Sequence, residues 1–169
     1  LSVKPLEDSN KYKQSSHEVF TPNPCRLMLV GDSGSGKSSA AAIVFEALMP
    51  ITTRWHLIAP TIYTDGTFDH FKRLIEAGLK RENVSPSDPG ENPYHESMED
   101  LPEIVAQATR RTRAHKAAGE KYCPQTLLYI DDAITFMRHN TALDHLLATS
   151  RHIGISVILC TQQFVGAST

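Results

Sequence analysis

The feature that most constrains the fold is the glycine-rich segment at residues 31–38, Gly-Asp-Ser-Gly-Ser-Gly-Lys-Ser. It follows a short apolar run at residues 25–30. It precedes residues 38–49, where apolar side chains recur at helical spacing until Pro50. A loop of this kind between a buried strand and a helix turns tightly and directs backbone N–H groups at a phosphate. The sequence therefore predicts a P-loop that binds a nucleoside triphosphate with Mg²⁺.

The residue types in this segment predict specific contacts. Lys37 is expected to reach the β- and γ-phosphates, and the Ser38 hydroxyl is expected to occupy one position around Mg²⁺. The nucleotide-binding residues predicted here are Gly31, Asp32, Ser33, Gly34, Ser35, Gly36, Lys37, Ser38 and Ser39.

Three further apolar runs, at residues 55–59, 126–130 and 155–160, predict buried strands. Helices are expected at residues 68–77 with Gly78 as the C-cap, from about 98 or 102 to 118, and at 141–150. Residues 79–98 are rich in proline and polar residues, which indicates a long exposed loop. Strands that alternate with helices favour a parallel sheet covered on both faces. We expect an N-terminal arm at residues 1–24 and one α/β domain at residues 25–169.

Composition excludes several classes of protein. The 169 residues, 40% of them hydrophobic, suffice for one buried core. The net charge of −2 argues against a chain that is basic overall and binds nucleic acid through its whole surface. The three cysteines fit neither zinc spacing nor a disulfide framework. No apolar run has membrane-spanning length and no signal peptide is visible, so we expect neither a membrane nor a secreted location. A chain that begins with Leu rather than Met is expected to be a piece of a longer protein.

Two adjacent carboxylates, Asp131 and Asp132, end the strand predicted at residues 126–130. The carboxyl ends of parallel strands form the edge where α/β sheets place their ligands. Asp131 is therefore the candidate metal ligand that partners Ser38, and Asp132 is the candidate that polarises the attacking water. The alternative is that the pair caps a following helix.

Gln162 follows the strand at residues 155–160. It can contact the γ-phosphate or the attacking water if this strand lies between the P-loop strand and the strand that ends in Asp131. Gln163 competes for the same role. Arg151 precedes the strand, where it either complements the end of a helix or reaches a neighbouring subunit's site as an arginine finger. A basic stretch at residues 110–116 is interpreted as a solvated helix face rather than a phosphate site.

Three segments taken together resemble a known family: residues 31–38, Leu-Leu-Tyr-Ile-Asp-Asp at 127–132, and Arg-His-Ile-Gly-Ile-Ser-Val-Ile-Leu-Cys-Thr-Gln at 151–162. They resemble the FtsK–HerA superfamily of P-loop translocases. Within it, the likeness is greatest to the poxvirus-type genome-packaging ATPases of large DNA viruses and Maverick/Polinton transposons. Ala-Pro-Thr at residues 59–61 also looks like that family. The resemblance spans about residues 25–163.

This resemblance implies an additional-strand (ASCE, RecA-like) P-loop NTPase with sheet order 5-1-4-3-2, whose fifth strand is expected outside the present sequence. It implies ATP and Mg²⁺ as cofactors, with Asp131 as the Walker B acid. Asp132 stands where relatives carry a glutamate base, Gln162 matches the polar sensor, and Arg151 matches the trans-acting arginine.

The same resemblance implies a Mg²⁺-dependent ATPase that translocates double-stranded DNA. It is expected to act as a homo-oligomeric ring of about five or six subunits. The resemblance further implies that the protein acts with a viral capsid or portal-like vertex. It also implies a location in the cytoplasm or nucleus of a host cell, in a virus factory or virion. The alternatives are a conjugation or chromosome-partition pump, a nucleotide or small-molecule kinase, and a scaffold that binds ATP without turnover. In a kinase, the Asp131 strand would lie directly beside the P-loop strand.

Overall fold

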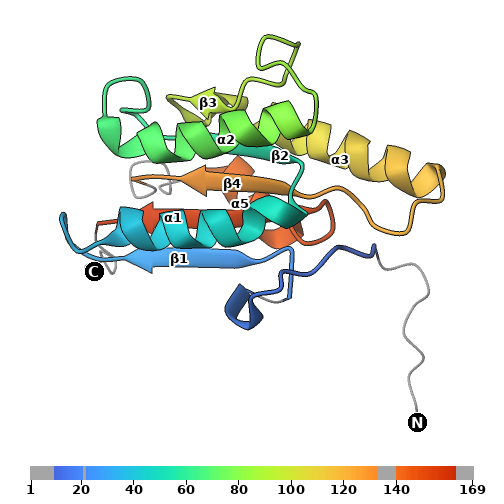
Figure 1. Ribbon diagram of the computed structural model, residues 1–169, viewed down its shortest axis with the longest axis horizontal. Coiled ribbons are helices and arrows are strands. Elements are labelled where there is room, and N and C mark those ends of the chain that lie inside the picture. Colours follow the sequence, from blue (N-terminus) through green and yellow to red (C-terminus); the bar gives the residue numbers. More distant parts are fainter. Residues whose placement is uncertain (1–9, 21, 133–139, 163–169) are drawn as a thin grey trace.

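A computed structural model describes residues 10–20, 22–132 and 140–162. Its centre is a five-stranded, all-parallel sheet with the order β1-β5-β4-β2-β3. The strands are β1 (Arg26–Val30), β2 (Arg54–Ile58), β3 (Tyr94–His95), β4 (Thr126–Ile130) and β5 (Ile155–Thr161). All strands run toward the end of the sheet where the P-loop lies (Figure 1).

Helices cover both faces of the sheet, which gives three layers. The α-helices are α1 (Lys37–Leu48), α2 (Asp69–Arg81), α3 (Leu101–Ala117) and α5 (Thr141–Thr149). Short 3-10 turns are η1 (Glu18–Phe20), η2 (Met49–Ile51), η3 (Gly66–Phe68) and η4 (Met98–Asp100). One core cluster joins α1 and α2 to the sheet and a second joins α3 and α5 to its other face.

The alternation of side chains along β4 decides which layer each residue enters. Leu127 and Tyr129 face α1 and α2, whereas Leu128 and Ile130 face α3 and α5. Every residue of β4 and of β5 is buried, as expected for central strands of a parallel sheet.

The strand order confirms the predicted three-layer, additional-strand fold. β5 lies between the P-loop strand β1 and the strand β4 that ends in Asp131. This arrangement contradicts the kinase alternative, which requires β4 to pair directly with β1. The four strands expected from the apolar runs are all present, but the expectation that residues 25–30 form a buried strand is wrong, because β1 lies at the edge of the described sheet and its alternate residues are exposed.

Two expectations about residues 68–98 are wrong. Gly78 does not cap a helix, because α2 continues through it to Arg81. Gly78 is instead buried against the indole of Trp55, where a side chain would not fit. The segment 79–98 is also not wholly an exposed loop, because β3 adds to the edge of the sheet beside β2 and His95 is buried. The segment was assigned as a loop because it is rich in proline, and a strand of only two residues is too short to show an alternating pattern.

Residues 10–20 and 22–24, within the predicted arm, run along the end of the sheet opposite to the P-loop (Figure 1). Tyr12 is buried there and its hydroxyl donates to the carbonyl of His152 at 3.0 Å. No helix of the described residues is long and apolar enough to cross a membrane.

Candidate nucleotide site

The P-loop joins β1 to α1 in the conformation that phosphate binding requires. Gly34 and Gly36 have positive φ angles of 77° and 89°, a region that other residues rarely adopt. Gly36 is also the N-cap of α1, and no side chain caps that end of the helix. The first N–H groups of α1 therefore remain directed at the loop, where a phosphate can accept from them.

The side chain of Lys37 is held inside this loop. Its Nζ donates to the carbonyl of Gly31 at 2.6 Å and to that of Asp32 at 2.7 Å. Ser35 N–H donates to the Asp32 carbonyl at 3.2 Å, which closes the turn. The ammonium group is thus positioned over the loop by backbone oxygens rather than neutralised by a carboxylate.

A pocket of about 420 Å³ opens in front of the loop. Four segments line it: the P-loop with the start of α1, the turn after β2, the end of β4 and the end of β5. The lining residues are Ser33, Gly34, Gly36, Lys37, Ser38, Ser39, Asp65, Thr67, Asp131, Asp132, Cys160, Thr161 and Gln162. Gly31, Asp32 and Ser35 were predicted with this set but do not line the pocket; they take part in the hydrogen bonds within the loop.

Asp131 lies two residues after Tyr129 and faces the α1 side of the sheet. The Tyr129 hydroxyl donates to its Oδ1 at 3.3 Å, and its own N–H donates to the carbonyl of Ile58 at 2.9 Å. Burial raises the pKa of Asp131, while hydrogen bonds from Asp132 and Tyr129 and the charge of Lys37 act in the opposite direction. A carboxylate that loses solvent in this way gains from a nearby cation.

Asp132 follows in an unusual backbone conformation. Its φ of 49° places it in the left-handed region, which is uncommon for a residue other than glycine and recurs at functional sites. The side chain lines the pocket. Asp131 and Asp132 therefore share one site despite being adjacent in the chain, where an extended strand would send them to opposite faces.

The residues present fit Mg²⁺. The Ser38 hydroxyl and the Asp131 carboxylate line the same pocket and are the hard oxygen donors that this ion prefers. Among the described residues, no group of three or more His, Cys, Asp or Glu side chains is arranged to hold a metal ion. A nucleotide-bound Mg²⁺ needs no such group, because phosphate and water oxygens complete its shell. When bound, the ion would neutralise charge on the phosphate oxygens.

Gln162 is exposed at the end of β5 and lines the pocket, next to Thr161. This is the position from which an amide can reach the γ-phosphate or a water beside it. Gln163, the competing candidate, lies outside the described residues.

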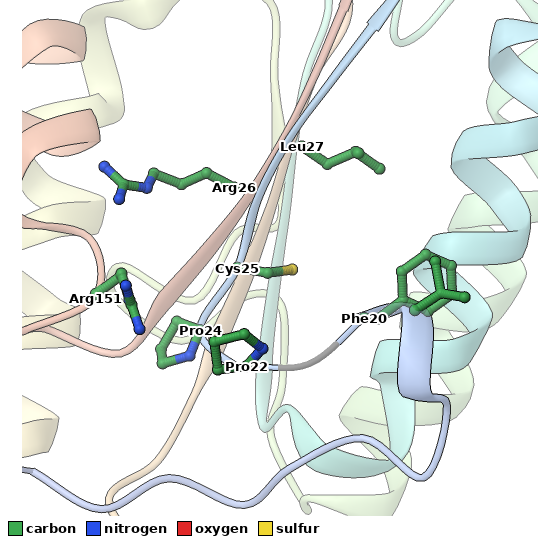
Figure 2. A pocket seen from close by; sticks show the side chains of 8 residues that line it. Phe20, Pro22, Pro24, Cys25, Arg26, Leu27 and Arg151 are labelled. Atoms are coloured by element: carbon green, nitrogen blue, oxygen red, sulfur yellow. The ribbon is translucent and has the colours of Figure 1, made fainter.

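Arg151 is the predicted site residue that the fold does not bring to the pocket. It precedes β5, whereas Gln162 follows it, and the seven residues of β5 span about 20 Å. Figure 2 shows Arg151 beside Pro24 near the start of β1, on the same side of that strand as Arg26. These residues line a separate pocket with Phe20 and Cys25. Arg151 therefore cannot act on the nucleotide of its own chain.

The sequence analysis missed four lining residues, namely Cys160 and Thr161 at the end of β5, and Asp65 and Thr67. Asp65 and Thr67 belong to the turn between β2 and α2, which is η3 with its N-cap. The available signal was the Asp-Gly-Thr sequence a few residues beyond a strand end, because Asp readily caps a helical turn. Nothing in that local pattern indicates that the turn bends back to the P-loop.

The chain is similar in fold to parts of larger solved structures. One is EccC (ATPases 2 and 3) of Thermomonospora curvata, in complex with a signal sequence peptide. It has a TM-score of 0.51 and 15% identity, over 82% of the present chain and 25% of that one. Another is the pCW3 conjugation coupling protein TcpA with ATPγS. It has a TM-score of 0.49 and 15% identity, over 83% of this chain and 43% of that one. The chain thus spans less than half the length of these structures, and the likeness concerns the fold alone.

No curated protein matches the chain. The family model described as the AAA domain matches residues 26–165, which include every strand, every helix and the whole pocket. The chain therefore belongs to the AAA domain family of P-loop ATPases.

Proposed function

We propose that this chain is the motor domain of a DNA translocase of the FtsK–HerA superfamily, which couples ATP hydrolysis to the movement of double-stranded DNA. The sequence resemblance at residues 127–132 and 151–162 points further, to genome packaging by a virus or virus-like element. The observation that carries the proposal is the position of β5. This strand separates β1 from β4 and ends at Gln162 in the same pocket as Lys37 and Asp131.

The geometry supports a division of roles in this pocket. Lys37 and the N–H groups at the start of α1 hold the β- and γ-phosphates. Ser38 and Asp131 hold Mg²⁺. Asp132 orients water for in-line attack, and the Gln162 amide contacts the γ-phosphate. Hydrolysis in this scheme needs no covalent intermediate, because positioning and charge stabilisation supply the catalysis.

The location of Arg151 supports action between subunits. An exposed arginine at the end of the sheet opposite to the pocket reaches a nucleotide only in a neighbouring copy. A ring of identical subunits provides that arrangement, because each interface repeats the same head-to-tail contact. A guanidinium group there would stabilise charge on the transferring phosphoryl group.

The central experiment is an ATPase assay with and without duplex DNA, on the full-length protein that contains this domain. We expect duplex DNA to stimulate ATP hydrolysis several-fold. We expect Lys37→Ala to abolish hydrolysis both with and without DNA. Hydrolysis that duplex DNA leaves unchanged, under conditions where the protein forms rings, would exclude translocation. Hydrolysis that is lost in Asp132→Asn would exclude a scaffold that only binds ATP.

Mixing variants tests the arginine. Arg151→Ala should lower hydrolysis while ATP still binds, and Lys37→Ala should bind poorly. A mixture of the two should recover part of the activity, since some interfaces then pair an intact P-loop with an intact Arg151. Arg110→Ala is the matched control, because Arg110 is an exposed arginine on α3 whose guanidinium group forms an ion pair with Glu103 at 2.7 Å, outside the pocket lining. If the mixture shows no recovery beyond the sum of its components, Arg151 does not act in trans.

A further inference from the structure

One wall of the nucleotide pocket comes from neither the P-loop nor the ends of β4 and β5. Asp65 and Thr67 supply it from the turn that precedes α2. In Figure 1 the start of α2 lies at the same end of the molecule as the start of α1 and the tips of the strands. The pocket is therefore closed on the α2 side by a carboxylate and a hydroxyl.

This wall has a defined local geometry. Asp65 is the N-cap of η3, and its Oδ1 accepts from the N–H of Thr67 at 2.8 Å. Its own N–H donates to the carbonyl of Thr61 at 2.9 Å. Hydrogen bonds from the side chain and backbone of Thr67 lower the pKa of Asp65, so the group is ionised near neutral pH. Asp65 is also exposed and lines the pocket, so its carboxylate retains lone pairs that can accept from a ligand.

The wall is also fixed to the rest of the site. Phe68, the next residue, is buried and lies 6.5 Å from the ring of Tyr129. Phe71, one turn further, stacks on Tyr129 with ring centroids 5.0 Å apart and meets Phe45 of α1 edge to face at 5.4 Å. Asp65 and Thr67 are thus carried by an element packed against both the P-loop helix and the strand that ends in Asp131.

The chemistry of the wall suits water rather than phosphate. A carboxylate repels the γ-phosphate but accepts hydrogen bonds from a water molecule strongly. We propose that Asp65, supported by Thr67, accepts a second hydrogen bond from the attacking water that Asp132 also contacts, and so orients this water from the α2 side of the pocket. This rests on the hydrolytic function proposed for the site and not on DNA translocation.

In the reaction, the water oxygen forms a bond to the γ-phosphorus while the bond from that phosphorus to the bridging oxygen breaks. ADP leaves with the electron pair of the broken bond, and the proton released by the water passes to the product phosphate or to solvent. Asp65 accepts a hydrogen bond throughout and does not itself take the proton, because a carboxylate with a lowered pKa is a weak base.

The test compares Asp65→Asn with Asp69→Asn. Asparagine caps a helical turn as well as aspartate does, so the first variant removes only the charge. Asp69 is an exposed acid four residues along, outside the pocket lining, and serves as the matched control. We expect Asp65→Asn to slow single-turnover hydrolysis at least 10-fold, with ATPγS affinity and the half-saturating Mg²⁺ concentration each within 3-fold of the unmodified protein.

Thr67 provides an independent arm. Thr67→Val removes the hydroxyl and keeps the shape of the side chain, and it should slow hydrolysis as Asp65→Asn does. Thr67→Ser keeps the hydroxyl and should hydrolyse ATP at the rate of the unmodified protein. Thr64→Val is the control, because Thr64 is an exposed threonine in the same turn that does not line the pocket. Binding of ADP with aluminium fluoride, which mimics the transition state, gives a readout without turnover. It should weaken in Asp65→Asn while ADP binding does not.

Three results would overturn the proposal. Hydrolysis and aluminium fluoride binding in Asp65→Asn that equal those of Asp69→Asn would remove the role altogether. ATPγS affinity that falls in parallel with the rate would make the wall a binding surface only. A raised Mg²⁺ requirement would assign Asp65 to the metal's hydration shell. None of these depends on DNA, so a protein that fails to respond to DNA leaves this test intact.

Discussion

The hydroxyl of Tyr129 donates a hydrogen bond to Oδ1 of Asp131 at 3.3 Å. Tyr129 is buried, stacks on Phe71, and its hydroxyl also interacts with the thiol of Cys160 on β5. Burial together with the neighbouring Cys160 and Asp131 raises the pKa of Tyr129, so it stays protonated and donates. The expected metal ligand is therefore oriented by a residue of the core that does not line the pocket.

Tyr129→Phe should raise the Mg²⁺ concentration needed for tight nucleotide binding by about 5-fold. The reason is that Asp131 loses a donor that favours its ionised form, a contribution of about 1 kcal/mol for a long hydrogen bond. A fluorescent ATP analogue titrated with Mg²⁺ measures this. Tyr94→Phe is the control, since that hydroxyl donates to the carbonyl of Lys72 at 3.5 Å and does not line the pocket. An unchanged Mg²⁺ requirement in Tyr129→Phe would show that Asp131 needs no such support.

Gly36→Ala should weaken nucleotide binding at least 10-fold while destabilising the fold by only about 1–2 kcal/mol. A Cβ at Gly36 meets nothing within 4 Å, so its effect comes from the positive φ of 89° and the resulting shift of the first N–H groups of α1. Gly119→Ala is a matched control, because Gly119 has a φ of 71° and equally open surroundings at the end of α3. Thermal unfolding should respond alike in both variants. If nucleotide affinity also responds alike, the loop geometry is not what binds phosphate.

Gly78→Ala should destabilise the protein by about 1–3 kcal/mol, the usual cost of overpacking a core. Alanine is the better helix former, so helix propensity alone predicts the opposite sign. A Cβ at Gly78 would lie 2.7 Å from Cη2 of Trp55 and 2.9 Å from Cε of Met49. Urea unfolding of the single variant and of Gly78→Ala in a Trp55→Leu background separates these effects. In the Trp55→Leu background, Gly78→Ala should lower the free energy of unfolding less than it does in the unmodified protein. Equal losses of stability in both backgrounds would mean that contact with the indole is not what destabilises the variant.

The sequence predicted those parts of the fold that follow from local patterns. The runs at residues 126–130 and 155–160 were recognised because a central parallel strand is apolar throughout. The run at residues 25–30, which forms the edge strand β1, was recognised because it leads directly into the P-loop. The placement of residues 155–161 between β1 and β4 came from the family resemblance instead, since no local pattern specifies which strands pair. Gly78 was misassigned because a glycine near the end of an apolar pattern has the same appearance whether it caps a helix or makes room for an indole.

The sequence predicted those lining residues of the candidate site that belong to contiguous motifs. Residues 31–38 and the pair Asp131 and Asp132 were assigned to one pocket from strand-end logic alone. Asp65 and Thr67 were missed because their place depends on how α2 packs on α1, which is a tertiary relationship. Arg111 was interpreted as part of a solvated helix face, but it is largely buried and lies 3.5 Å from Glu91. A partner twenty residues away leaves no periodic signal in the sequence.

The sequence did not indicate a chain of polar contacts that runs from two buried histidines, His56 and His95, to the exposed Asp100 at the start of α3. His56 Nδ1 is 3.1 Å from His95 Nε2, and His95 Nδ1 is 2.8 Å from Asp100 Oδ2. In the neutral tautomer that carries its proton on Nδ1, His95 donates to the carboxylate, and its Nε2 accepts from His56. Arg111 and Arg54 also act on His56. Burial, His95 and both arginines lower the pKa of His56 to about 3.

The lowered pKa of His56 predicts a loss of stability in acid. The ordinary value is 6.5, so between about pH 6.5 and pH 3 the unfolded chain binds a proton at this position that the folded chain does not. The free energy of unfolding should therefore fall by about 1.4 kcal/mol per pH unit from this group as the pH drops through that window, with no contribution above it. Urea unfolding at several pH values measures the slope, and His56→Gln should flatten it relative to the exposed control His152→Gln. An identical slope in the two variants would mean that His56 accepts its proton in the folded chain as readily as in the unfolded one.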